Sequence, residues 1–290
     1  MFIMIRLSTF GEVIGSHNKA LECRPDDYRS WYRRGNKLRI MGKYYDAVAS
    51  YEKAIERQPG DYRAWYQRGN ALDDLGRYEE AIASYNEALN LYAKDYWVWY
   101  WRGHSLRKVH RLVEALDSYN HALELKPNDY WSLYNRGHVL RELHRFDEAI
   151  ASYEQAMKIR ENDYWCWYWR GDCLRHLGRD KEAIASFNKA LKVKRNDFWS
   201  WLRRGDALRC LGRYESAIAS YNKALEVQPN DPDALYYKAC CCAKLRKVEL
   251  AIESLERAID LYSRKYLKLA QSDAYFDPIR GYQEFEALLQ

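Results

Sequence analysis

The sequence predicts an all-α fold, a solenoid of stacked antiparallel helix pairs, and three observations lead to it. Glycine recurs every 34 residues from Gly35 to Gly205, and alanine recurs at the same interval from Ala47 to Ala251. Each window of this length divides into two stretches with apolar residues at helical spacing. A pair of such short helices cannot cover its own apolar faces, so neighbouring pairs must stack and share a continuous core.

The composition is that of a folded chain. Of 290 residues, 48% are hydrophobic and 30% are charged, which is far from the composition of disordered segments. No apolar run approaches the roughly 20 residues that cross a bilayer. The opening "MFIMIRLSTF" lacks both the apolar core and the cleavage site of a signal peptide. We therefore expect a cytoplasmic protein with no membrane span.

Cysteine and charge usage narrow the class further. The seven cysteines have neither the paired spacing of a disulfide framework nor that of a zinc site, so we expect reduced, mostly buried side chains. The formal net charge of +6 comes from 47 basic and 41 acidic residues. This excess is too small to establish nucleic-acid binding and does not exclude it.

The helices are expected in pairs along the chain. "YRAWYQRGNALDDLG" and "RYEEAIASYNEALNLYAKD", residues 62–95, show the pattern, with glycine at the break between two helical stretches. Six units follow it, at 28–61, 62–95, 96–129, 130–163, 164–197 and 198–231.

The two ends depart from this pattern. Unit 232–265 is degenerate, with Leu235, Ala239 and Leu255 at places that other units fill with tryptophan, glycine and an aromatic residue. Residues 266–290 predict an apolar helix and a short helix after Pro278, which would cap the last exposed face. Residues 1–27 match only the second helix of a unit, so either "MFIMIRLSTF" replaces its partner or the chain begins further upstream. Self-association through this N-terminal end is a further prediction.

The residue spacing within a unit resembles the tetratricopeptide repeat, in an array of the bacterial multi-repeat type. The resemblance rests on six positions of the repeat, which in one unit are Trp65, Gly69, Leu72, Ala81, Tyr85 and Ala88. Six units share this pattern. The resemblance implies a right-handed superhelix in which the first helix of each pair lines a concave groove. It also implies a binding protein rather than an enzyme.

The aromatic stretch "YWCWYWRGDCLR" separates into two helix faces. At 100° per residue, Trp167, Gly171 and Leu174 share one face, which we expect to pack against the second helix of the unit. Trp165, Trp169, Asp172 and His176, with Tyr168 beside them, lie nearly opposite, where this packing does not need them. The resemblance assigns that second face to the groove.

Applied to the other units, the same assignment predicts the partner-binding residues. Tryptophans are expected as apolar anchors and arginines as charge partners, as at binding hot spots. The candidates are Trp97, Tyr100, Trp101, His104, Arg107, Trp131, Tyr134, Asn135, His138, Arg141, Trp165, Tyr168, Trp169, Asp172, Arg175, Trp199 and Arg203.

Comparing the units with one another separates two kinds of position. An arginine beside the glycine is identical in all six units, which favours a role in building the repeat (Arg34, Arg68, Arg102, Arg136, Arg170 and Arg204). The residue after the glycine varies, which favours recognition (Asn36, Asn70, His104, His138, Asp172 and Asp206).

Charges at the groove positions favour an anionic ligand segment. Ten cations fall there: Arg29, Arg33, Arg39, Arg63, Arg107, Lys108, Arg141, Arg175, Arg203 and Arg209. Five anions accompany them: Asp73, Asp74, Glu142, Asp172 and Asp206. We expect a protein or peptide partner, acidic and aromatic or proline-rich.

Other interpretations stay open. The tryptophans Trp97, Trp131, Trp165 and Trp199 would also fit a seam between adjacent units. The same Trp/Tyr/Arg groove would suit single-stranded RNA, although the five carboxylates repel phosphate.

A chaperone-tail carboxylate clamp does not fit, because the family's lysine site holds Tyr32, Tyr66, Tyr100, Tyr134, Tyr168 or Leu202. Neither a catalytic motif nor a metal ligand set is present, so no cofactor is expected.

Overall fold

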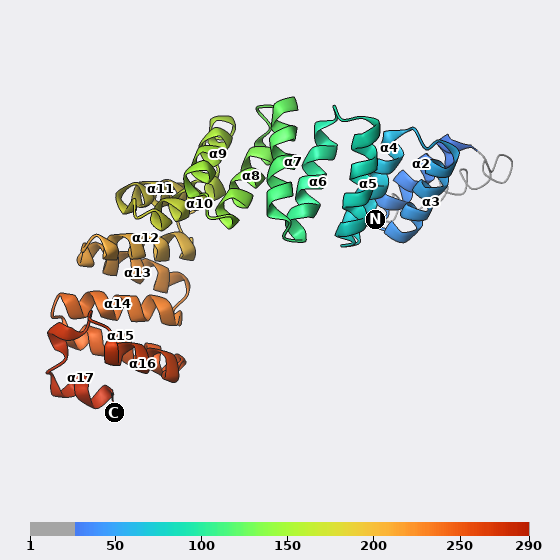
Figure 1. Ribbon diagram of the computed structural model, residues 1–290. Coiled ribbons are helices and arrows are strands. Elements are labelled where there is room, and N and C mark those ends of the chain that lie inside the picture. Colours follow the sequence, from blue (N-terminus) through green and yellow to red (C-terminus); the bar gives the residue numbers. More distant parts are fainter. Residues whose placement is uncertain (1–26, 290) are drawn as a thin grey trace, which may run out of the picture. The chain divides into compact units, whose positions relative to one another are not determined.

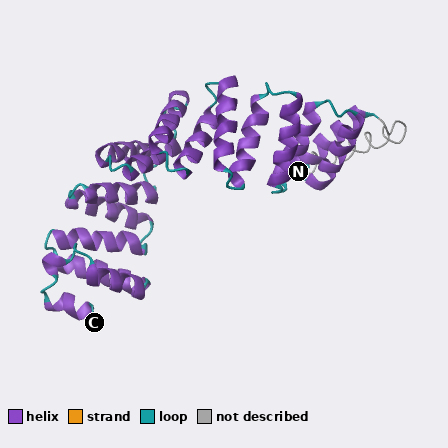
Figure 2. Cartoon of the chain, in the orientation of Figure 1, coloured by secondary structure: helices purple, strands orange, loops and turns teal. Residues whose placement is uncertain are grey.

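The computed structural model describes residues 27–289, and every regular element within them is helical (Figure 2). The chain divides into two compact units, Met1–His144 and Arg145–Gln290. The all-α solenoid class predicted from the repeat is confirmed within each of them. The partial repeat expected at 1–27, apart from Asp27, and the predicted self-association concern residues that lie outside the described part.

The first unit is a row of helices in which each packs against the next in the chain (Figure 1). These helices are α2 (Tyr28–Ile40), α3 (Tyr44–Arg57), α4 (Tyr62–Asp74), α5 (Tyr78–Leu91), α6 (Tyr96–Lys108), α7 (Leu112–Leu125) and α8 (Tyr130–Glu142).

The second unit has the same arrangement, with additional short elements at its end (Figure 1). It comprises α9 (Phe146–Ile159), α10 (Tyr164–His176), α11 (Asp180–Val193), α12 (Phe198–Cys210), α13 (Tyr214–Val227), α14 (Pro232–Lys244), α15 (Val248–Leu261), α16 (Ser263–Ser272), the 3-10 helix η1 (Asp277–Ile279) and α17 (Gln283–Leu288).

An aspartate begins the first helix of every pair. Its side chain accepts a hydrogen bond from a backbone N–H in the first turn, which satisfies a donor that the helix leaves open. Some of these caps also join successive pairs, since the hydroxyl of Tyr28 donates to Asp61 at 2.6 Å and that of Tyr164 donates to Asp197 at 2.5 Å. The same carboxylate thus starts one helix and contacts the preceding pair.

Close approach of the paired helices explains why glycine recurs every 34 residues. A Cβ atom added at Gly69 would lie 2.5 Å from Cε1 of Tyr85, and one added at Gly171 would lie 2.8 Å from Cε1 of Phe187. Both aromatic rings are fully buried. Only glycine therefore permits this helix separation, and the recurring alanines, all fully buried where described, serve the same packing.

The invariant arginine builds the repeat, as its uniformity predicts. Its Nη1 donates to a serine hydroxyl 16 residues later at 2.6–2.7 Å, and this serine lies on the second helix of the pair. The pairs are Arg34–Ser50, Arg68–Ser84, Arg102–Ser118, Arg170–Ser186 and Arg204–Ser220.

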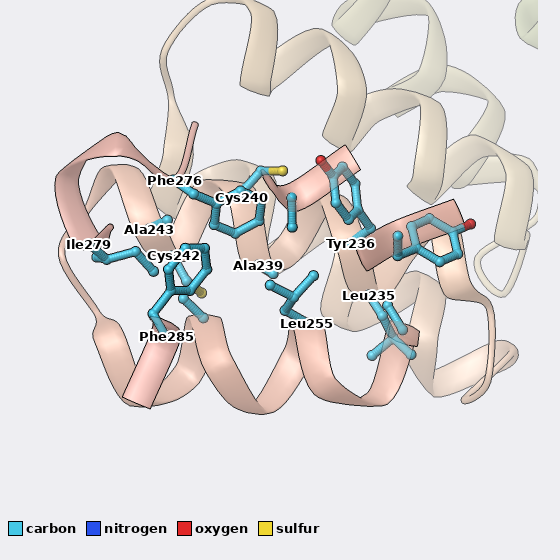
Figure 3. Close-up of a cluster of buried hydrophobic side chains, with 14 residues drawn as sticks. Leu235, Tyr236, Ala239, Cys240, Cys242, Ala243, Leu255, Phe276, Ile279 and Phe285 are labelled. Carbon is cyan, nitrogen blue, oxygen red and sulfur yellow. The ribbon is translucent and has the colours of Figure 1, made fainter. Parts of the chain in front are cut away.

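The C-terminal elements cover the last helix pair with aromatic side chains (Figure 3). Phe276, Ile279 and Phe285 are fully buried and pack into the cluster that contains Leu235 and Leu255 of α14 and α15. All three cysteines of the "CCC" run, Cys240, Cys241 and Cys242, are buried in α14. The helix faces of this last pair therefore bury more than one stripe of residues.

Candidate partner-binding faces

Four tryptophans at equivalent places expose much of their rings, and they define what we call the tryptophan faces. Trp97 is 39% exposed and Trp131 is 44% exposed in the first unit, while Trp165 is 50% and Trp199 is 51% exposed in the second. Each follows directly on the aromatic residue that begins its helix. The ring centroids of Trp165 and Tyr164 are 4.9 Å apart, and those of Trp199 and Phe198 are 5.0 Å apart. These contacts orient indoles that remain open to a ligand.

On α10 the aromatic side chains form a continuous group. Trp165 stacks on Trp169 at 6.4 Å with 17° between the ring planes, and Tyr168 meets Trp169 edge to face at 4.9 Å. Trp169 is half-buried and Tyr168 is buried. Offset and edge-to-face pairs of this kind are worth about 0.5–1.5 kcal/mol beyond their buried area. The exposed Trp165 therefore rests on an ordered base.

A similar aromatic group lies on α6 in the first unit. Tyr100 contacts Trp101 at 5.4 Å, and Trp101 contacts His104 at the same distance. His104 in turn lies 3.3 Å from the carboxylate of Asp73, measured from its Nδ1 atom. Trp101, His104 and Arg107 are half-buried, and so are Tyr134 and Arg141 on α8.

The expectation that all candidates are exposed is wrong for five of them. A first helix packs on its own partner and on neighbouring pairs, so its buried arc is wider than the single face counted from the sequence. Tyr168, for example, packs on Phe187 of α11 at 6.0 Å. The five buried candidates are Tyr100, Asn135, His138, Tyr168 and Asp172.

One of the buried candidates is a histidine that stays neutral. Burial, with the positive charges of Arg107 and Arg141 nearby, lowers the pKa of His138 to about 3. Its ring packs against Tyr134 at 4.5 Å. At neutral pH this side chain therefore adds no positive charge to the face.

The residue after the glycine has an internal role in three units. The hydroxyl of Tyr51 donates to Asn36 at 2.8 Å, that of Tyr85 to Asn70 at 2.9 Å, and that of Tyr221 to Asp206 at 3.0 Å. Buried hydroxyls need such acceptors. Asn36, Asn70 and Asp206 thus bond to the core of their own pair, which corrects the expectation that their variation reflects recognition.

Most of the groove carboxylates are satisfied within the protein. Nε of Arg39 lies 2.7 Å from Oδ2 of Asp74, and Nε of Arg107 lies 3.0 Å from Oε1 of Glu142. In both pairs the arginine reaches the next helix pair, 35 residues further on. Arg203 pairs with Asp206 at 3.2 Å on its own helix.

Arg175 occupies the same place in its pair, but the residue 35 positions on is the exposed Cys210. Its Nε is buried without a hydrogen-bond partner, and no carboxylate within the described residues lies in ion-pair range of its guanidinium. Asp180 feels its charge only at longer range. The sequence comparison missed Cys210, although the 35-residue register of arginine and acid would have singled it out.

Trp167 is less buried than its helical phase predicts. Gly171 and Leu174 are buried against α11 as expected, whereas Trp167 is half-buried at the edge of the pair. Its Nε1 donates to the carbonyl of Glu161 at 3.1 Å, and Nζ of Lys189 lies 5.8 Å from its ring centroid. The residue therefore packs at an edge of the repeat rather than in its centre.

The described residues contain neither a cluster of metal-ligating side chains nor a helix that could span a membrane. Within residues 27–289, no three His, Cys, Asp or Glu side chains are placed to hold a metal ion. No helix in that range is long and apolar enough to cross a membrane.

Stacked antiparallel helix pairs with a repeated face define an α-helical repeat protein. A tetratricopeptide repeat profile matches residues 32–96, 134–197 and 202–265, and a second profile of that repeat matches residues 96–162. The chain belongs to the tetratricopeptide repeat family. No curated protein matches it in sequence.

Solved structures agree with this fold. YrrB, described as a TPR protein with an unusual peptide-binding site, is 26% identical with a TM-score of 0.60, over 65% of this chain and 97% of that one. The C-terminal part of a TPR protein from Cytophaga hutchinsonii is 18% identical with a TM-score of 0.70, over 82% and 98%. MamA is 22% identical with a TM-score of 0.56, over 58% and 92%.

Proposed function

We propose that this chain is a non-enzymatic interaction scaffold that binds an extended or helical segment of a partner protein on its tryptophan faces. The observation that carries the proposal is the combination, on α10, of the half-exposed Trp165 with Arg175, which has no ion-pair partner in the described chain. Aromatic and arginine side chains are the residues most enriched at binding hot spots. The cytoplasmic location expected from the sequence stays a prediction.

The charges favour a segment that is acidic as well as aromatic or proline-rich. Arg39, Arg107 and Arg203 are already paired with carboxylates of the protein, so they offer little to a ligand. Arg175 is the cation whose partner position is held by an uncharged cysteine. A carboxylate on the bound segment would take the place of the missing acid. YrrB, with its peptide-binding site, supports this class of ligand.

Single-stranded RNA is the alternative ligand, and the stacked aromatic rings are the observation that favours it. Trp165 and Trp169 present stacked rings, and bases stack on such rings at about 1–3 kcal/mol each. A nucleic-acid complex would weaken steeply with salt, because phosphate binding releases counterions. A peptide that relies on indole contacts would depend less on salt.

Affinity capture with the full-length protein tests the proposal. Wild type is compared with Trp165→Ala/Trp199→Ala, with and without RNase, and helicity is checked by circular dichroism. We expect protein partners that the double variant loses and RNase does not affect. The control variant is Tyr45→Ala/Tyr262→Ala, which removes aromatic rings that are 70% and 65% exposed away from the tryptophan faces. Equal capture by all three proteins contradicts the proposal, and partners lost on RNase treatment favour the RNA alternative.

A further inference from the structure

An open pocket lies on the other side of α12, between this helix and α11 and α13, which lie next to it in Figure 1. Residues of these helices line this pocket, which has a volume of about 890 Å³. Trp201 lines it, and it follows the exposed Trp199 by two residues, about 200° around the helix. The pocket therefore lies away from the tryptophan face of α12. We call it the Trp201 pocket; its other apolar wall residues are Leu191 and Val227.

The tryptophan itself belongs to the repeat. Nε1 of Trp201 donates to the carbonyl of Arg195 at 2.8 Å. Trp65 makes the same bond to Pro59 at 3.1 Å, and Trp99 makes it to Ala93 at 2.8 Å. Because this bond recurs, the feature that distinguishes the Trp201 pocket is not the indole but the charge around it.

Cations dominate the lining of the pocket. Lys192, Arg195, Arg204 and Lys223 face a single carboxylate, that of Glu226, which pairs with Lys223 at 2.8 Å. Lys192 and Arg195 are exposed, and within residues 27–289 neither side chain makes a hydrogen bond or an ion pair. At least two positive charges thus remain available to a ligand.

One equivalent place in the first unit, around Trp65, has the opposite charge. Around Trp65 the positions of Asn188, Lys192 and Lys223 are held by Glu52, Glu56 and Glu87. There Arg68 forms an ion pair with Glu52 at 2.8 Å. In the Trp201 pocket Arg204 instead bonds the neutral Asn188 at 2.8 Å. The same scaffold is therefore acidic at one place and basic at the other, so the fold does not require the cations.

We infer that the Trp201 pocket docks an acidic segment of a partner protein that also carries leucine-like apolar side chains. Lys192 and Arg195 would bind its carboxylates, and Trp201 and Val227 would contact its apolar side chains. Nucleic acid fits less well, because the guanidinium of Arg204 lies 5.4 Å from the Trp201 ring centroid and covers one face of the ring that a base would need.

Fluorescence anisotropy with the full-length protein tests this site. The probe is a short fluorescein-labelled peptide of alternating Glu and Leu pairs, and its matched control has Lys in place of Glu. We expect saturable binding of the acidic peptide alone at about 0.1 M salt. Lys192→Glu/Arg195→Glu weakens that binding by about tenfold or more. Lys181→Glu/Lys268→Glu changes the net charge equally at exposed lysines outside the pocket and leaves the affinity unchanged within about twofold.

Three outcomes overturn the inference. The acidic peptide fails to bind saturably, or both charge-reversed variants weaken it equally, which would indicate non-specific attraction. The third is tighter binding of a single-stranded oligothymidine that Lys192→Glu/Arg195→Glu abolishes, which would make the pocket a nucleic-acid site. None of these substitutions lies on a tryptophan face, and the capture experiment uses substitutions on those faces alone, so the two experiments test the Trp201 pocket and the proposed function separately.

Discussion

Arg107 donates a hydrogen bond to Glu142 of the next helix pair, with 3.0 Å between Nε and Oε1. Arg39 makes the same contact with Asp74 at 2.7 Å. In the first unit, an acidic residue 35 positions further on thus pairs with each of these two arginines. In the second unit Cys210 stands where the acid would be, so the register offers Arg175 no carboxylate.

An acidic residue at position 210 should therefore reduce partner binding on the tryptophan face of α10. Cys210→Glu places a carboxylate within reach of Arg175, and we expect partner capture to fall as much as it does in Arg175→Ala. The unfolding free energy should change by only about 0.5 kcal/mol, because a partly exposed ion pair gains little and a negative charge at a helix C-terminus is unfavourable. The uncharged Cys210→Gln serves as the control and should bind as wild type does. Full binding by Cys210→Glu would show that Arg175 takes no part.

The glycine at the helix crossing should not tolerate even one methyl group. Gly69→Ala gains about 1 kcal/mol of helix propensity, but its Cβ would lie 2.5 Å from Tyr85. That ring cannot move away easily, because it is fully buried and its hydroxyl donates to Asn70 at 2.9 Å. We expect a net loss of about 1–3 kcal/mol from overpacking, measured by urea unfolding.

Gly60→Ala is the matched control for this change. Gly60 lies in the turn between α3 and α4, and a Cβ there meets no atom within 4 Å. Its unfolding midpoint should stay close to that of wild type. A Gly69→Ala protein as stable as the control would mean that the helix pair can widen at no cost.

His138 should make stability depend on acid pH. Its pKa is about 3 in the folded protein and about 6.5 in the unfolded chain, so the unfolded state takes up the proton first as pH falls. The contribution is fully present above about pH 6.5 and is lost toward pH 3, at up to about 1.4 kcal/mol per pH unit. We expect His138→Gln to show a shallower fall of unfolding free energy over that range. Parallel curves for both proteins would show that His138 is protonated without cost in the fold.

The sequence was sufficient to predict the helix pairs. It was not sufficient to predict how much of the surface of each helix is buried. Recurrent residues such as Gly69 and Ala81 report close helix contact directly, and the exposure of Trp165 and Trp199 follows from their place on the helix. Tyr168 and Asp172 were misplaced because a solenoid helix contacts more than its own partner. Their burial depends on neighbours that a single-helix projection leaves out.

Contacts between successive helix pairs could not be predicted from the sequence for a related reason. The link from Arg107 to Glu142 spans 35 residues, one more than the repeat, so aligning equivalent positions does not bring the two together. The charge of the Trp201 pocket was missed because the comparison was limited to first helices. Glu56 and Glu87 correspond to Lys192 and Lys223 four repeats later, and this reversal of charge was the signal that would have found it.

Site-specific photocrosslinking tests the role of the tryptophan faces most directly. A photoreactive phenylalanine is placed at Trp165 or Trp199, and at Tyr45 or Tyr262 as exposed controls, in otherwise unchanged full-length protein. We predict protein crosslinks from positions 165 and 199 that are absent from positions 45 and 262. Equal crosslinking from all four positions, or crosslinks to RNA alone, would contradict binding of a protein segment on these faces.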